Sequence, residues 1–149
     1  MANVVPFSFA QELLKGNHDF ISDTIKLALY TAGSGAPYST SDTVYSSGVA
    51  NEVSGAGYTT GGNTLNNAVV ANQTSVATLT FDQTQFTSAT FGAAYAVIYN
   101  STDSNKLVVV LDFGGTKSCS NGTFTITFPS TSSSGPGAAG TNSLISISS

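Results

Sequence analysis

The sequence predicts an all-β fold: a single-domain sandwich or flattened barrel with one short N-terminal helix and a flexible C-terminal arm. Three observations predict it. The chain has 149 residues, enough for one compact domain but not for two. Only 8% of the residues are charged, and Ser, Thr, Asn and Gly stand where charged residues would be, against roughly 25% charged in an average soluble domain. Six or seven short stretches alternate apolar with polar side chains and are separated by turn residues.

The one helical stretch lies near the start of the chain. Residues 9–15 (FAQELLK) form the predicted helix, with Ser8 as its candidate N-cap and Gly16 as its stop.

Strands dominate the remainder of the predicted domain, which spans residues 1–129. A continuous apolar run in residues 106–113 indicates burial on both faces. Residues 32–49 are rich in Gly, Ser, Thr, Pro and Tyr, which predicts a long surface loop. The predicted strands comprise residues 23–30, 64–70, 75–81, 93–99, 106–113 and 122–128.

The C-terminal residues 130–149 differ in composition from the domain. Residues 130–141 (STSSSGPGAAGT) are typical of a linker. The apolar side chains of Leu144, Ile145 and Ile147 then alternate with serines, which predicts a strand-like tip. Such a tip pairs with a free sheet edge, either of its own domain or of another molecule, and the sequence leaves both open.

The charges argue against two classes of partner. The net charge is −4, the cations are four lysines, and arginine is absent. Binding to nucleic acid or to an anionic membrane requires clustered cations, so neither is predicted. No apolar run reaches the length of a membrane span, and the first residues resemble no signal peptide, so we expect synthesis in the cytoplasm.

Residues able to carry chemistry are few. Cys119 is the single cysteine, and we interpret it as a core or loop thiol. His18 is the single histidine, and its neighbour Asp19 could form a proton-transfer pair with it, although a histidine in a turn is the simpler interpretation. Residues 112–114 spell the kinase metal-binding triplet Asp-Phe-Gly, which we interpret as a strand ending at a glycine turn.

Oxygen ligands for calcium are present but scattered. Glu52, Asp82, Asp103 and Asp112 are the candidates, and no dense loop of alternating aspartates joins them. We therefore predict no catalytic residue, no cofactor and no dedicated metal site, and a protein that is not an enzyme.

Four segments resemble one family of proteins. Residues 51–62 (NEVSGAGYTTGG) match the pattern NEVSGxGYTxGG of small virion structural proteins from tailed bacteriophages and prophages. Residues 23–31 and 94–100 are similar to two strands of the same proteins, and the segments 112–115 and 121–126 to their closing hairpin. The resemblance covers residues 9–129 in order. It departs at Ala94, where the family has arginine, and in the C-terminal extension.

The resemblance implies a structural protein of the virion, made in the host cytoplasm. Within that class we expect a capsid decoration (cement) protein, which binds the major capsid protein or other virion proteins and self-associates as a homotrimer or similar cyclic assembly. The alternative is a tail or fibre component that binds the host surface, with Tyr38 and Tyr45 of the 32–49 loop on its recognition surface. A lytic enzyme, the third class, would need paired carboxylates that nothing in the sequence marks.

Overall fold

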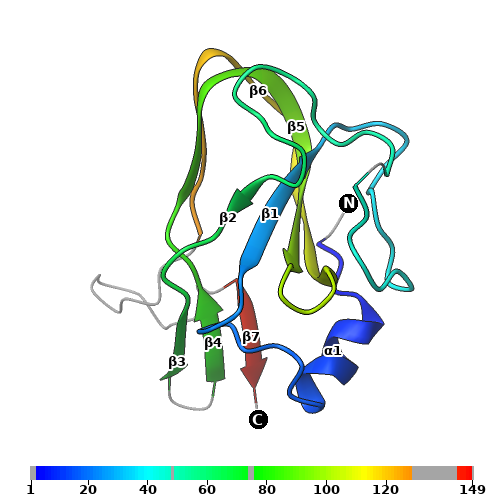
Figure 1. The fold of residues 1–149 in the computed structure, drawn as a ribbon, viewed down its shortest axis with the longest axis vertical. Coiled ribbons are helices and arrows are strands. Elements are labelled where there is room, and N and C mark those ends of the chain that lie inside the picture. The colour runs from blue at the N-terminus through cyan, green and yellow to red at the C-terminus, as the bar shows by residue number, and fades with distance from the viewer. Residues whose placement is uncertain (1–2, 48, 74–75, 129–143, 149) are drawn as a thin grey trace.

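The computed structural model describes residues 3–47, 49–73, 76–128 and 144–148. Within these ranges it confirms the all-β prediction, with a single short helix and seven strands in two antiparallel sheets (Figure 1). The elements are α1 (Phe7–Leu14), β1 (Ile25–Tyr30), β2 (Asn63–Thr64), β3 (Val69–Gln73), β4 (Val76–Thr80), β5 (Thr84–Asn100), β6 (Lys106–Ile126) and β7 (Ile145–Ser148).

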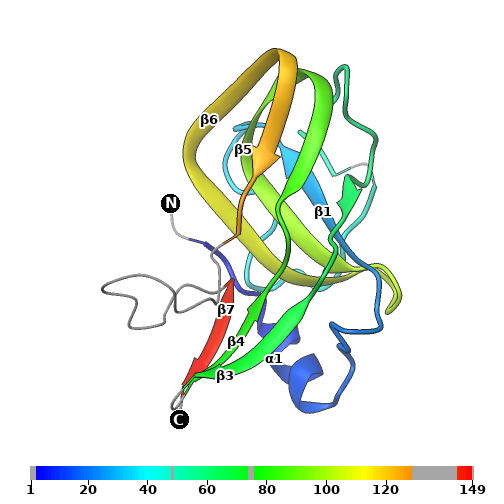
Figure 2. The same cartoon turned by 90° about the vertical axis from the view of Figure 1, so that its left-hand side faces the viewer.

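The larger sheet has the strand order β2-β1-β5-β6, and the smaller has the order β3-β4-β7. The long strands β5 and β6 form one hairpin that reaches from the smaller sheet to the opposite end of the molecule (Figure 2). Bulges interrupt its register at four places, and bulges bend and twist a strand pair. The hairpin can therefore curve along its length while remaining paired.

Both faces of the larger sheet are buried. On one face, Leu27, Ile98 and Val108 belong to a core cluster that includes Leu79 of β4 and Phe9 of α1. The opposite face contributes to a second cluster, which the chain between β1 and β2 covers. The prediction of burial on both faces is therefore confirmed for the central residues 107–110 of the 106–113 run.

Two strand predictions need correction. The predicted strand 64–70 is divided between β2 and β3, which lie in different sheets, because Asn67 adopts a positive φ of 51°. The predicted strand 106–113 and residues 122–126 of the predicted strand 122–128 belong to the single strand β6. Gly114 and Gly115 adopt positive φ angles without ending that strand.

The helix begins two residues earlier than predicted. Pro6 occupies the N-cap position and no side chain caps the helix, whereas Ser8 lies inside α1. Pro6 is extended, with a φ of −60° and a ψ of 144°, as is usual for the residue before the first helical turn. Gly16 follows the helix with a φ of 73°, as expected for a helix stop.

The strand-like tip lies on its own chain. β7 pairs with β4 and becomes the third strand of the smaller sheet, so residues 144–148 pack with the domain instead of leaving it. The predicted linker 130–141 lies outside the described residues.

Candidate interaction surface

Helix α1 carries apolar side chains on two faces. Phe9 is buried in the core, and Leu13 packs against the same cluster. Phe7 and Leu14 point the other way, with 74% and 90% of their surface exposed. Because seven residues make almost two turns, these two side chains lie on one outward stripe. Exposed apolar groups gathered on one element indicate a contact surface.

Helix α1 and the smaller sheet lie at the same end of the molecule (Figure 1). An apolar groove of about 100 Å³ lies between them. Its lining residues are Phe9, Leu13, Phe20, Val70, Ala77, Thr78, Leu79, Ile145 and Ile147. Val70 and Ile147 are largely exposed, as is Ile21 in the loop after α1. We use the term apolar end for the five exposed apolar side chains that α1, the loop after it and the smaller sheet carry at this end of the molecule: Phe7, Leu14, Ile21, Val70 and Ile147.

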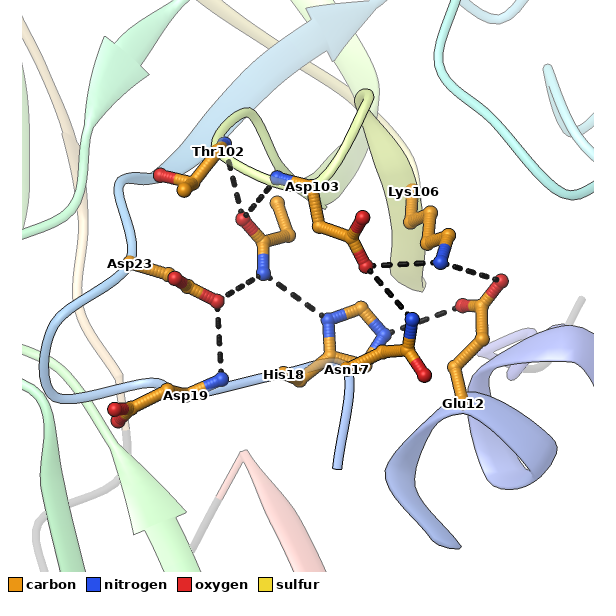
Figure 3. A network of polar contacts seen from close by, with 9 residues as sticks. Glu12, Asn17, His18, Asp19, Asp23, Thr102, Asp103 and Lys106 are labelled. Carbon is orange, nitrogen blue, oxygen red and sulfur yellow. Dashed lines mark hydrogen bonds and ion pairs between the residues drawn. The ribbon is translucent and has the colours of Figure 1, made fainter. Parts of the chain in front are cut away.

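A buried histidine fixes α1 to the loop that follows it (Figure 3). The His18 side chain is fully buried, and its ring packs against both Phe9 and Phe20, with centroid distances of 5.2 and 5.7 Å. Its Nε2 atom lies 3.2 Å from a carboxylate oxygen of Glu12. The partner of this histidine is thus a residue of α1 and not the adjacent Asp19.

Asn100, at the end of β5, joins the histidine to the hairpin turn. Its Oδ1 accepts hydrogen bonds from the backbone N–H groups of Thr102 and Asp103. The amide nitrogen Nδ2 must therefore face the other side, where it donates to Asp23 at 2.6 Å and to Nδ1 of His18 at 3.2 Å.

This arrangement determines the tautomer of a neutral His18. Because Nδ1 accepts from Asn100, the ring proton lies on Nε2, which donates to Glu12. A histidine beside a carboxylate can serve as a general base. Here the ring is sealed from solvent, so it cannot reach a substrate and instead ties α1 to the hairpin.

A partly exposed ion pair extends the network. Lys106 lies 2.8 Å from Asp103 and 3.9 Å from Glu12, and Asn17 donates to Asp103 at 3.4 Å. The hydrogen bond from Lys106 lowers the pKa of the Asp103 carboxyl below its ordinary value and raises the pKa of the lysine. Residues of α1, of the following loop and of the hairpin turn therefore form one connected unit that holds the apolar end in place.

A second, partly buried network lies in the segment that carries the family-like pattern. Glu52 accepts hydrogen bonds from the hydroxyls of Tyr45 and Tyr58 at 3.0 and 2.7 Å, and from the backbone N–H of Gly61 at 2.7 Å. Tyr58 also accepts from the N–H of Leu29 in β1. The pattern 51–62 thus folds around one carboxylate and attaches to the larger sheet.

Two glycines of the pattern are required by close packing. Gly62 has a φ of 70°, and a Cβ atom there would overlap the carbonyl oxygen of Leu27. Gly57 has a φ of 81°, and its Cβ would press on the backbone of Thr87 and Ala89. Both positions combine a left-handed conformation with backbone contact, which only glycine tolerates.

The two tyrosines expected on a recognition surface are buried instead. Tyr38 and Tyr45 are 5% and 6% exposed, within the second core cluster. Tyr45 stacks on Tyr99 with a centroid distance of 4.1 Å, and Tyr38 packs edge-on against Tyr30. The polar composition of the 32–49 loop indicated its irregular backbone, but the loop inserts its aromatic rings into the sheet.

The four carboxylates considered as calcium ligands have separate protein partners. Glu52 binds the tyrosines and Asp103 binds Lys106, whereas Asp82 accepts from Asn67, and Asp112 from the N–H of Gly114. Across the part of the chain that the structure describes, no three metal-ligating side chains gather at one place.

The other sequence features have structural roles. The Asp-Phe-Gly triplet is a bend within β6, because Asp112 accepts from the N–H of Gly114, whose φ is 70°. Cys119 is a free thiol that packs against the larger core cluster.

Comparisons with family models, with curated proteins and with solved structures found no match to this chain. Among the described residues, no helix has the length and apolar character needed to cross a membrane.

Proposed function

We propose that this chain is a structural protein of a bacteriophage virion, and specifically a capsid decoration (cement) protein without enzymatic activity. One observation carries the proposal on the structural side: a short helix exposes Phe7 and Leu14, although its other face already packs on the core. A stable free monomer gains nothing from such a surface, whereas a subunit that docks on a neighbour buries it. The resemblance of residues 9–129 supports the choice of a virion.

The mechanism is non-covalent bridging. The apolar end docks on the major capsid protein, and each copy contacts more than one shell subunit. A single contact of this size is weak, but repeated contacts across a shell add by multivalency and oppose the pressure of the packaged DNA. The rigid attachment of α1 through His18 and Asn100 supports this mechanism, because a fixed surface loses little entropy on docking.

The test is the occupancy of particles by variants of the apolar end. We expect Leu14→Ser and Phe7→Ser to fold normally, since both side chains are exposed, and to reduce the amount of protein bound per particle at least tenfold. Thr87→Ala is the control and should bind as the parent does. Thr87 is exposed and lies near the open end of the hairpin, away from the turn that contacts α1. Unchanged occupancy of both serine variants would show that the protein docks elsewhere.

The number of copies separates the shell from the tail. A stained gel of purified virions should show hundreds of copies per particle for a decoration protein. A few to dozens of copies would favour the tail or fibre alternative.

A further inference from the structure

Among the described residues, strand β7 has one backbone partner, strand β4. Residues 145–148 pair with residues 76–79 of β4, and the N–H of Leu144 donates to the carbonyl of Leu79 at 2.9 Å. Leu144 and Ile145 pack against the core cluster, and Ile147 lines the groove beside α1. β7 therefore occupies a site along the edge of β4 in the smaller sheet, and its own side chains form one wall of the groove.

The connection to β7 does not determine which molecule fills that site. Residues 129–143 separate β6 and the following Phe128 from Leu144, and none of them is charged or has a large apolar side chain. Fifteen residues reach about 50 Å when extended. A compact domain of this length is about 40 Å across. The chain is thus long enough to carry β7 to the same site on an adjacent copy.

We propose that β7 is an exchangeable strand, which occupies the β4 edge of a second copy when copies lie close together. The contacts within one chain and between two chains are the same, so exchange costs little beyond association itself. A Ser- and Gly-rich connection of this length gives an effective concentration in the millimolar range, which neighbouring copies in an assembly can match. The inference concerns self-association and does not rest on the virion role.

The surfaces beside the site favour association in the exchanged form. Ile147 on β7 is 53% exposed. Val70 on β3, the strand on the other side of β4, is largely exposed as well. A second copy brought in by its own β7 lies next to these side chains and can bury them. Exchange therefore has two effects at once: β7 pairs with the second copy, and that copy covers the apolar side chains that are exposed in the single chain.

Engineered cysteines distinguish the two arrangements. Ala77 and Ile147 are opposite each other in the β4–β7 register, at the separation that a disulfide spans. In a Cys119→Ser background, one chain carries Ala77→Cys, and a second chain of different length, extended by a tag, carries Ile147→Cys. The two are unfolded, mixed, refolded at low and at high concentration, and oxidised.

Exchange predicts a disulfide-linked dimer of the two different chains, in a fraction that rises at least fivefold from the low to the high concentration. The double variant Ala77→Cys/Ile147→Cys, refolded at low concentration, should close an intrachain bond and so prove that the pair is competent. Replacing the first partner by Thr87→Cys should abolish the mixed dimer. If the competent pair yields only uncrosslinked single chains at the highest concentration, the exchange proposal is wrong.

A second pair guards against a variant that fails to fold. Val76 and Ser148 are also opposite each other, and the same mixing experiment applies to them. Particle occupancy is measured separately, so a negative cross-linking result leaves the proposed function standing, and a negative occupancy result leaves the exchange standing.

Discussion

Both glutamates of the chain act inside the fold as hydrogen-bond acceptors. Glu12 accepts from His18 and thereby orients the helix, and Glu52 accepts from two tyrosines and one backbone N–H. Glu12 connects α1 to the loop that follows it, and Glu52 connects parts of the segment between β1 and β2. In a chain with so few charges, these two residues hold irregular segments in place by hydrogen bonds. Hydrophobic packing alone fixes such segments poorly.

The contribution of Glu52 can be measured with one substitution. Glu52→Gln keeps the size of the side chain but replaces one acceptor oxygen by a donor N–H₂ group, which then faces a tyrosine hydroxyl or the N–H of Gly61. We expect the free energy of unfolding to fall by about 1–3 kcal/mol, the cost of an unsatisfied buried polar group. Urea unfolding followed by circular dichroism gives this value.

Asp82→Asn is the matched control for the Glu52 substitution. Its carboxylate accepts from Asn67 at the surface, so the change should stay within about 0.5 kcal/mol. Equal effects of the two substitutions would contradict the conclusion that the hydrogen bonds of Glu52 stabilise the fold.

At the level of elements, the alternation of side chains identified most strands but not their limits. The first part of β5 escaped prediction because Ser88 adopts a φ of 51° and bulges break the period of two between Phe86 and Phe91. Asn67 divides one predicted strand between two sheets. Such features depend on single backbone conformations, which periodicity does not encode.

The candidate site was predicted less completely than the fold. Leu144, Ile145 and Ile147 were identified by their alternation, but the edge that receives them follows from tertiary packing. Phe7 and Leu14 look like core residues in the sequence, because apolar residues on both faces of a helix give no sign of which face is buried. Tyr38 and Tyr45 were placed at the surface because the loop around them is polar, but both rings are buried.

Strand β7 offers a matched pair of substitutions at the element scale. Ile145 packs against the core, whereas Ile147 is 53% exposed two residues later on the same strand. We expect Ile145→Ser to lower the free energy of unfolding by about 2 kcal/mol through lost burial, and Ile147→Ser to change it by no more than about 0.5 kcal/mol. Chemical unfolding of dilute protein measures both. Equal losses at the two positions would mean that β7 is bound differently from the pairing described.

On the scale of the whole molecule, the tyrosines that pack against the two faces of the larger sheet make the fold sensitive to alkali. Burial raises the pKa of Tyr30, Tyr45 and Tyr58 well above the ordinary value, and that of Tyr99 to about 12. In the unfolded chain these hydroxyls ionise near pH 10. Between pH 10 and 12 the unfolded chain therefore releases protons that the folded chain retains, so stability that is complete below pH 10 is lost as the pH rises through this window.

The urea midpoint should accordingly be constant up to about pH 9.5 and then fall steadily toward pH 12, the range set by the ordinary tyrosine pKa and the raised pKa of Tyr99. Tyr99→Phe removes one of the titrating groups and should flatten this decline, although it also lowers stability at neutral pH through loss of the hydrogen bond to Gly61. The slope of the midpoint against pH is thus the informative quantity. The ultraviolet absorbance of tyrosinate provides an independent measurement, because the folded protein should develop it at higher pH than the protein in urea. Coincident absorbance curves for the two states would show that these tyrosines are open to solvent in the folded protein.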